Sequence, residues 1–246
     1  RDAAEQYLAH ETLPKSGTDD VLGVQLAQIL SEASLSLFVR QAAAIALKKY
    51  VRKRWSIFFD TFTQDMVVNG IVQTVDATPV EAKEHIRTSL LACLCDAEPK
   101  VRSQASDILS LISSCDFPDH FPQLLPTLQA YLHSYTEQDA HAAYKVHGAM
   151  KFLLDLVHVE LDENQLLMVA QQLVPLLQGI VSSSSDWITP HTRARCINVF
   201  HQCLISLYMA KDTYVDTVHM VTTHYLPPWL QGMQVLMSPD FFNSAN

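Results

Sequence analysis

Four stretches of the chain repeat one pattern of apolar and polar positions. Within 101–112, apolar or small residues occupy the first, fifth, eighth, ninth and twelfth positions: Val101, Ala105, Ile108, Leu109 and Ile112. These offsets fall on one face of a helix with about 3.6 residues per turn. The same template begins again at three other positions, Val39, Val146 and Thr192. The pattern therefore predicts four amphipathic helices of one kind.

The spacing of these four helices indicates a repeat architecture. Their starts lie 62, 45 and 46 residues apart. The last two intervals fit the period of about 40–47 residues that is typical of HEAT or armadillo arrays. The longer first interval requires an insertion, which the polar, β-branched run Thr61–Thr78 provides. We therefore expect an all-α fold, a right-handed α-solenoid (superhelix) of HEAT repeats made of antiparallel helix pairs.

Prolines and polar loops divide the chain into expected repeats. These are 1–34, 35–98 with an inserted loop at about 56–80, 99–137, 138–186, 187–228, and 229–246 as the start of a further repeat or a disordered end. A helix is expected in 1–9, and the partner helices of the template are expected at 20–30, 79–96, 122–135, 164–182 and 212–226. Pro175 is expected to kink or break its helix, and Pro227-Pro228 to end the last one.

Composition narrows the class of protein. The chain has 246 residues, 48% of them hydrophobic, with 6 Gly and no run of eighteen apolar residues, so no membrane span is expected. Because it begins at Arg1 rather than Met, we expect a soluble fragment of a longer protein. The net charge of -9 disfavours direct nucleic-acid binding and is compatible with basic partners.

The search for catalytic or metal-binding motifs predicts no enzyme, no cofactor and no metal. There is no Gly-rich phosphate loop, Gly-x-Ser-x-Gly or His-Glu-x-x-His, and the 11 His do not cluster at ligand spacing. The five Cys are an odd number at apolar helical positions, so we expect buried, reduced thiols in a reducing compartment: Cys93, Cys95, Cys115, Cys196 and Cys203.

The basic run Lys48–Trp55 has two interpretations. It is either a patch for nucleic acid or another anionic partner, or the solvated C-terminal end of a helix whose Tyr50, Val51 and Trp55 face the core. The second is favoured, because no companion basic stripe appears elsewhere.

Two segments resemble the importin-beta (karyopherin-beta) family. One is 39–51 followed by Arg54-Trp55, and the other is 101–125, with Asp116-Phe-Pro and Phe121-Pro-Gln-Leu-Leu125. Phe121 stands where the family usually has Trp. The segments 146–150, 173–177 and 192–195 are most similar to the importin-nine branch and its fungal counterpart.

The resemblance implies a nuclear import receptor that shuttles between cytoplasm and nucleus. Its expected partners are Ran in its GTP form, FG-repeat nucleoporins and basic cargo. In that branch the cargo is core histones, TATA-binding protein and some ribosomal proteins. A monomer without membrane or direct nucleic-acid contact is expected. An exportin-like receptor and a HEAT-repeat scaffold without a transport role remain open, whereas an enzyme on an α-solenoid is disfavoured.

The resemblance also suggests contact residues. For Ran, the candidates are polar residues of the first three helices lining the concave face: Gln25, Gln28, Glu32, Glu84, Arg87, Thr88, Gln123 and Gln129. For basic cargo, the candidates are acidic residues near repeat turns: Glu98, Asp116, Asp119, Asp162 and Glu163. The signature positions Arg40, Arg102, Trp55, Pro118 and Pro122 are expected to be structural.

Overall fold

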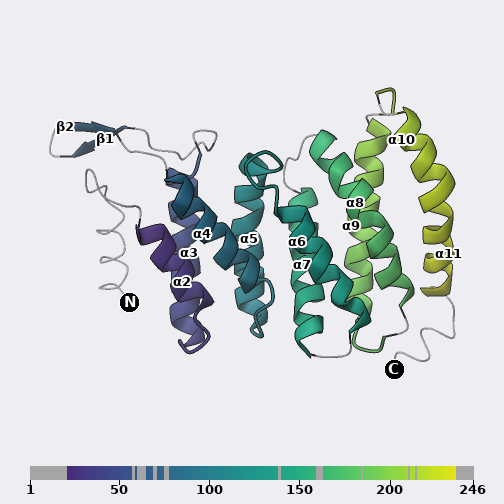
Figure 1. Ribbon diagram of the computed structural model, residues 1–246, viewed down its shortest axis with the longest axis horizontal. Coiled ribbons are helices and arrows are strands. Elements are labelled where there is room, and N and C mark those ends of the chain that lie inside the picture. Colours follow the sequence, from purple (N-terminus) through teal and green to yellow (C-terminus); the bar gives the residue numbers. More distant parts are fainter. Residues whose placement is uncertain are drawn as a thin grey trace. The chain divides into compact units, whose positions relative to one another are not determined.

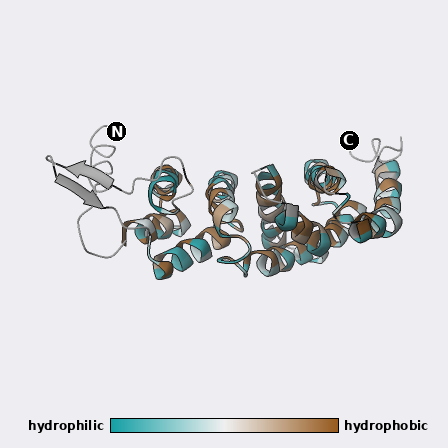
Figure 2. Ribbon diagram, turned by 90° about the horizontal axis from the view of Figure 1, so that it is seen from above, coloured by the Kyte–Doolittle hydropathy of each residue, from teal (hydrophilic) through white to brown (hydrophobic). Residues whose placement is uncertain are grey.

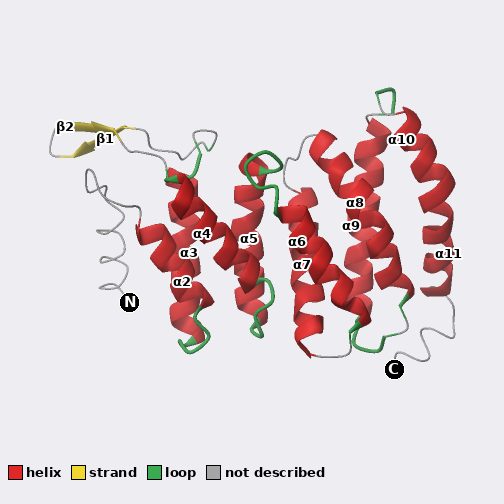
Figure 3. Ribbon diagram, in the orientation of Figure 1, coloured by secondary structure: helices red, strands yellow, loops and turns green. Residues whose placement is uncertain are grey.

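The computed structural model describes 21–56, 59, 65–68, 71–74, 78–137, 140–158, 163–183, 185–209, 211–213 and 215–236. Its elements are α2 (Val21–Ser31), α3 (Leu37–Arg54), β1 (Asp65–Val68), β2 (Ile71–Thr74), α4 (Val80–Cys93), α5 (Pro99–Asp116), α6 (Leu124–His133), a 3-10 turn (Ser134–Thr136), α7 (Ala140–His158), α8 (Glu163–Ser182), α9 (Pro190–Met209), α10 (Val215–Met220), a π-helical turn (Val221–Tyr225) and α11 (Leu226–Leu236). The predicted all-α class is confirmed (Figures 1 and 3). The helix expected in 1–9 lies outside the described residues. No described helix is both long and apolar enough to cross a membrane.

The helices form two compact units, 1–117 (unit 1) and 118–246 (unit 2). In unit 1, α2 packs beside α4 and α3 beside α5, while α2 also packs on α3 and α4 on α5. Unit 2 repeats this arrangement, with α6 beside α8 and α7 beside α9. Each unit thus has the two layers of antiparallel helices that HEAT repeats require (Figure 2). Since helices pack across the predicted boundaries at 34/35 and 98/99, the exact division into repeats stays a prediction.

The template positions form the core of both units, as predicted. In α5 all five are buried, and in α9 all five are buried as well. In α3 the first position, Val39, is 42% exposed and the other four are buried. In α7, Leu154 is half-buried and the rest are buried. The helical period of the sequence therefore identifies which face of each helix packs inward.

In unit 1, an arginine follows the first template position and ties the helix to a neighbouring turn. Arg40 on α3 donates from Nε to the Leu30 carbonyl (2.8 Å) and forms a part-buried ion pair with Asp96. Arg102 on α5 donates to the carbonyls of Asp96 and Ala97, the latter at 2.9 Å. These guanidinium groups satisfy carbonyls that the helix ends and turns leave without a partner.

Unit 2 uses different contacts at the same template position. Arg193 on α9 donates to the carbonyls of Ile188 (2.7 Å) and Ser183 (2.6 Å) in the loop before its helix. On α7 the position is His147, whose Nδ1 lies 2.6 Å from Oγ1 of Thr192 on α9. The side chain after the template start therefore connects helices or turns in every repeat.

The insertion after α3 contains a β-hairpin that the sequence analysis did not predict. β1 and β2 pair antiparallel, with Asp65 opposite Thr74 and Val68 opposite Ile71. The prediction of a plain loop at 56–80 is corrected by this pairing. A signal was present, because Asn69-Gly70 between two β-branched runs is the strongest short-range sequence signal for a hairpin.

The prediction that Pro227-Pro228 ends a helix is wrong, and so is a break at Pro175, whereas a kink at Pro175 stays a prediction. α8 continues through Pro175, which is exposed, while its neighbours Val174 and Leu177 are buried. Packing of the apolar face on both sides of Pro175 outweighs the cost of one lost hydrogen bond. Pro227 and Pro228 do not end a helix either. They lie in the first turn of α11, where proline is tolerated, directly after the wider π-helical turn.

All five cysteines are free thiols, and three of them are buried as expected: Cys93, Cys196 and Cys203. Burial raises the pKa of each of these three to about 12. Cys95 and Cys115 are half-buried. A buried thiol stays protonated and inert at neutral pH.

The basic run forms the C-terminal end of α3, with its apolar side chains in the core, as the favoured interpretation predicts. Tyr50, Val51 and Trp55 are buried in the core. The last turn carries the three cations at the negative end of the helix dipole: Arg52, Lys53 and Arg54.

Candidate docking surface

Five of the residues predicted to contact Ran lie on one exposed layer of unit 1. Gln25 and Gln28 are exposed on α2, and Glu32 is exposed just after its end, at spacings of three and four residues. Glu84 and Thr88 are exposed on α4, four residues apart. These spacings place each set on one face of its helix or helix end, and α2 packs beside α4. We call these five residues the α2–α4 surface.

This surface offers two carboxylates and two primary amides. The Ser34 N–H donates to Glu32 Oε1 (3.1 Å), and hydrogen bonding from Ser34 lowers the pKa of Glu32. Glu84 Oε2 accepts from Arg87 Nη1 (3.2 Å). Glutamine side chains both donate and accept, so the surface suits a polar protein partner.

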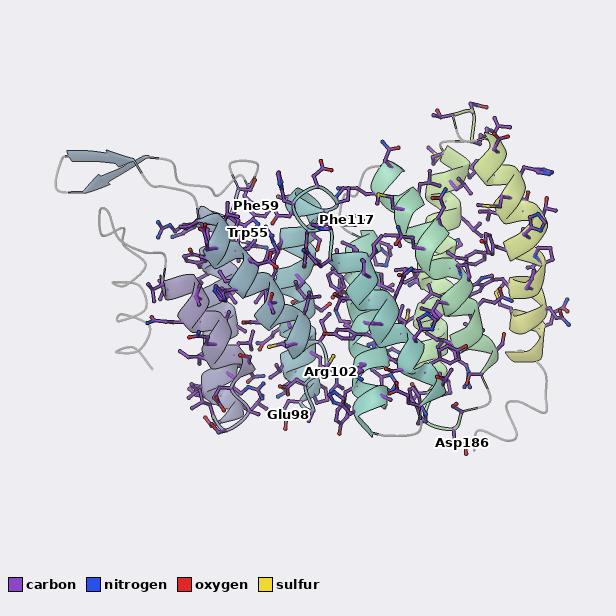
Figure 4. The ribbon with its side chains drawn as sticks, in the orientation of Figure 1. Trp55, Phe59, Glu98, Arg102, Phe117 and Asp186 are labelled. Carbon is purple, nitrogen blue, oxygen red and sulfur yellow. The ribbon has the colours of Figure 1, made fainter. Side chains whose placement is uncertain are left out.

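Arg87 and Asp116 are not available for contact, although both are among the predicted site residues. Each side chain is about 5% exposed, and each binds the other. Arg87 donates to Asp116 Oδ2 from Nε (3.1 Å) and Nη2 (2.7 Å). Trp55 donates its indole N–H to the same oxygen (2.9 Å), as its place at the end of α3 in Figure 4 allows. This buried ion pair has a structural role, and neither side chain is exposed for contact with Ran or cargo.

A lysine missed by the sequence analysis completes this cluster. The Lys83 ammonium lies 5.1 Å from the centre of the Trp55 ring, and the Arg87 guanidinium lies 5.6 Å from it. Burial lowers the pKa of Lys83. The sequence signal for Lys83 is its spacing, because a residue four positions before Arg87 lies on the same face of α4.

The remaining Ran candidates belong to unit 2. Gln123 is exposed just before α6, and Gln129 is half-buried on α6. Gln129 donates from Nε2 to the Gln172 carbonyl on α8 (3.3 Å). These two residues are therefore separate from the α2–α4 surface.

The described cargo candidates belong to different elements of the two units. Glu98 is exposed at the turn before α5, as Figure 4 shows, and Asp119 is exposed after α5. Glu163 is the first residue of α8, and Asp162 lies outside the described residues. Among the residues that the structure describes, no group of three His, Cys, Asp or Glu is placed to hold a metal ion.

Comparison with known proteins identifies the N-terminal region. The sequence profile of the importin-beta N-terminal domain matches residues 9–96, which include α2, α3, the hairpin and α4. Residues 9–96 are thus similar to the importin-beta N-terminal domain, and most of the chain is similar to importin subunits. The predicted resemblance is confirmed, and the α2–α4 surface lies inside the matched region.

Two relatives and one solved structure extend the likeness to most of the chain. It is 28% identical over 203 residues to importin subunit beta-5 of Schizosaccharomyces pombe, covering 82% of this chain and 19% of that protein. It is 25% identical over 185 residues to importin-9 of Drosophila melanogaster, covering 75% and 16%. The fold is similar to that of Lph2, a bidirectional nuclear transport receptor of S. cerevisiae, with a TM-score of 0.59, 15% identity and coverage of 83% and 21%. The chain therefore spans about a fifth of the length of these proteins.

Proposed function

We propose that this chain is the N-terminal, Ran-GTP-binding part of a nuclear import receptor. The observation that carries the proposal is that residues 9–96 match the importin-beta N-terminal domain and contain the exposed α2–α4 surface. The two importin relatives that align with most of the chain support import as the direction of transport.

The α2–α4 surface is the proposed contact for Ran in its GTP form. Two neighbouring helices display amides and carboxylates at helical spacing. Amides and carboxylates displayed in this way by two neighbouring helices can donate and accept hydrogen bonds along the switch segments of a GTPase. The buried Arg87–Asp116 pair holds α4 against α5 and so fixes the helix that carries Glu84 and Thr88.

The cargo in this proposal is a basic protein such as a core histone. The net charge of -9 favours a basic partner, and exposed acidic side chains such as Glu98 and Asp119 supply local contacts. Ran-GTP and cargo disfavour each other, and linkage makes that effect reciprocal. The receptor works as a monomer without catalysis of its own, binds FG-repeat nucleoporins, and shuttles between cytoplasm and nucleus.

Calorimetric titration with Ran tests the proposal. We expect binding to Ran loaded with a non-hydrolysable GTP analogue and none to Ran loaded with GDP. Gln28→Ala should weaken binding by about 1 kcal/mol, roughly fivefold, because it removes one polar contact. Gln231→Ala, an exposed glutamine of α11 in unit 2, is the matched control and should leave binding unchanged. Equal binding to both nucleotide states, or none to either, would overturn the proposal.

A further inference from the structure

The two ends of the insertion between α3 and α4 are joined by contacts among Tyr50, Arg54 and Thr78, which we call the neck. The Thr78 N–H donates to the Arg54 carbonyl (2.9 Å), and Thr78 Oγ1 donates to the same oxygen (2.9 Å). Thr78 Oγ1 also lies 3.0 Å from the Tyr50 hydroxyl. Thr78 is 4% exposed and Trp55 is fully buried. Buried contacts therefore hold the two ends of a 21-residue segment, 57–77, together.

The neck is fixed to the first described helix as well. A Cβ at Gly23 on α2 would lie 2.5 Å from a ring carbon of Tyr50, so only glycine lets the ring approach this closely. Tyr50 in turn contacts Thr78. The base of the insertion is thus part of the packed core of unit 1.

The hairpin that this neck carries has two open edges. Within the described residues its sheet has two strands, so the outer edge of each strand pairs with nothing there. The pairing is continuous from Asp65–Thr74 to Val68–Ile71, without a bulge. The strands Asp-Met-Val-Val and Ile-Val-Gln-Thr contain no Lys and no Pro. Natural proteins protect open edges with Lys, Pro, bulges or very short strands, and of these the described hairpin has only its four-residue strands.

The charge of the insertion favours a basic segment as a third strand beside the hairpin. Segment 57–77 carries three acidic residues, Asp60, Asp65 and Asp76, and no Lys or Arg. An acidic strand would be repelled, whereas a basic one would gain attraction along with its backbone hydrogen bonds. A two-stranded hairpin alone is marginally stable in water, so a third strand also stabilises it.

We infer that the edge of the β1–β2 hairpin binds an extended, Lys- and Arg-rich segment of a partner protein as a third strand. Backbone hydrogen bonds supply the affinity and alternate side chains the selectivity. The inference deepens the proposed function, because a basic tail of the cargo is the partner it assigns. The competing occupant is the chain's own basic α3 end, with Arg52 and Lys53 beside the neck.

Hydrogen exchange with a synthetic peptide tests the inference. The probe is a ten-residue peptide of alternating Lys and Val. Its control has the same sequence with every second backbone amide N-methylated, which keeps the charge but blocks strand pairing. At a probe concentration ten times its Kd, exchange of the amides of Asp65–Val68 and Ile71–Thr74 should slow about tenfold, because binding stabilises the paired hairpin by the factor 1 + [L]/Kd. The N-methylated peptide should leave exchange unchanged.

Two variants separate charge from fold. Asp65→Asn should weaken probe binding about threefold, because it removes one of the three negative charges of the insertion. Asp212→Asn, at an exposed site in unit 2, should not change it. Equal slowing by both peptides would reduce the effect to charge attraction and overturn the inference. Unchanged exchange with both peptides would overturn it too. So would slow exchange of the hairpin amides in the absence of the probe, if that protection disappears in Arg52→Ala/Lys53→Ala, because the α3 end would then occupy the edge. Ran binding, measured on the same sample, reports separately on the proposed function.

Discussion

Units 1 and 2 use one hydrophobic template but join their helices differently. In unit 1, two ion pairs cross between elements, the part-buried Arg40–Asp96 and the buried Arg87–Asp116. In unit 2, Arg193 donates to the backbone carbonyls of Ile188 and Ser183, and a His147–Thr192 hydrogen bond links α7 to α9. A buried charge pair needs both partners, whereas a carbonyl that loses an arginine is neutral. Unit 1 should therefore be the more sensitive to single substitutions at these joints.

The largest expected effect follows from breaking the buried pair of unit 1. Arg87→Ala leaves the Asp116 carboxylate buried without its cation and should lower the free energy of unfolding by about 3–5 kcal/mol. Urea unfolding followed by circular dichroism measures it. Lys49→Ala, an exposed cation of α3, is the control and should stay within about 0.5 kcal/mol of the parent. The double variant Arg87→Met/Asp116→Leu should recover most of the loss, and a loss in Arg87→Ala below about 1 kcal/mol would contradict the account.

The next expected effect is a difference in thiol reactivity between buried and half-buried cysteines, and Cys93 of unit 1 shares the raised pKa of the buried thiols of unit 2. Cys196 and Cys203 of unit 2 have a pKa of about 12, so at pH 8 their thiolate fraction is about a thousandfold below that of a thiol at 9.0. Iodoacetamide should therefore label the half-buried Cys95 and Cys115 of unit 1 first, as peptide mass spectrometry would show. Because folding raises these pKa values, the thiols contribute stability below pH 9 that is lost as the pH rises towards 12. Early labelling of Cys196 in folded protein would contradict this assignment.

A smaller effect is expected at the joint of unit 2. Arg193→Ala removes two charge-assisted hydrogen bonds to Ile188 and Ser183 but leaves no buried charge. We expect a loss of about 1.5–3 kcal/mol in urea unfolding. His191→Ala, an exposed residue of the same first turn, serves as control. If Arg193→Ala cost more than Arg87→Ala, the contrast between the units would be wrong.

The smallest effect is expected at the neck of the insertion. Thr78→Val removes the hydroxyl that donates to the Arg54 carbonyl and contacts Tyr50, and should cost about 1 kcal/mol of folding free energy. Thr78→Ser keeps the hydroxyl and should lie closer to the parent. Hydrogen exchange of the hairpin amides should quicken in Thr78→Val alone, and identical exchange in both variants would remove the role given to the neck.

Local periodicity explains what could be predicted from the sequence. A helix buries residues three and four apart, so the template at Val101 and Thr192 identified core residues without knowledge of any partner. The exposed Gln25, Gln28 and Thr88 followed from the same helical geometry. The expected class of partner came from the resemblance to a known family, because periodicity contains no information on partners.

Features that depend on contacts between residues distant in the sequence could not be predicted from it. Arg87 and Asp116 are 29 residues apart, and either charge is compatible with an exposed face until the helices are packed. The helix through Pro175 depends on tertiary packing that outweighs the local cost of proline. The hairpin is different, because Asn69-Gly70 between two β-branched runs is a local sequence signal for it.

The most direct test of the transport account is the effect of Ran-GTP on bound cargo. A complex of this chain with a core histone dimer is titrated with Ran carrying a non-hydrolysable GTP analogue, and free histone is followed by fluorescence anisotropy. The account predicts release of the histone, and no release with GDP-loaded Ran or with Ran that does not bind the chain. Histone binding that strengthens when Ran-GTP is added would contradict an import receptor and indicate an exportin-like one.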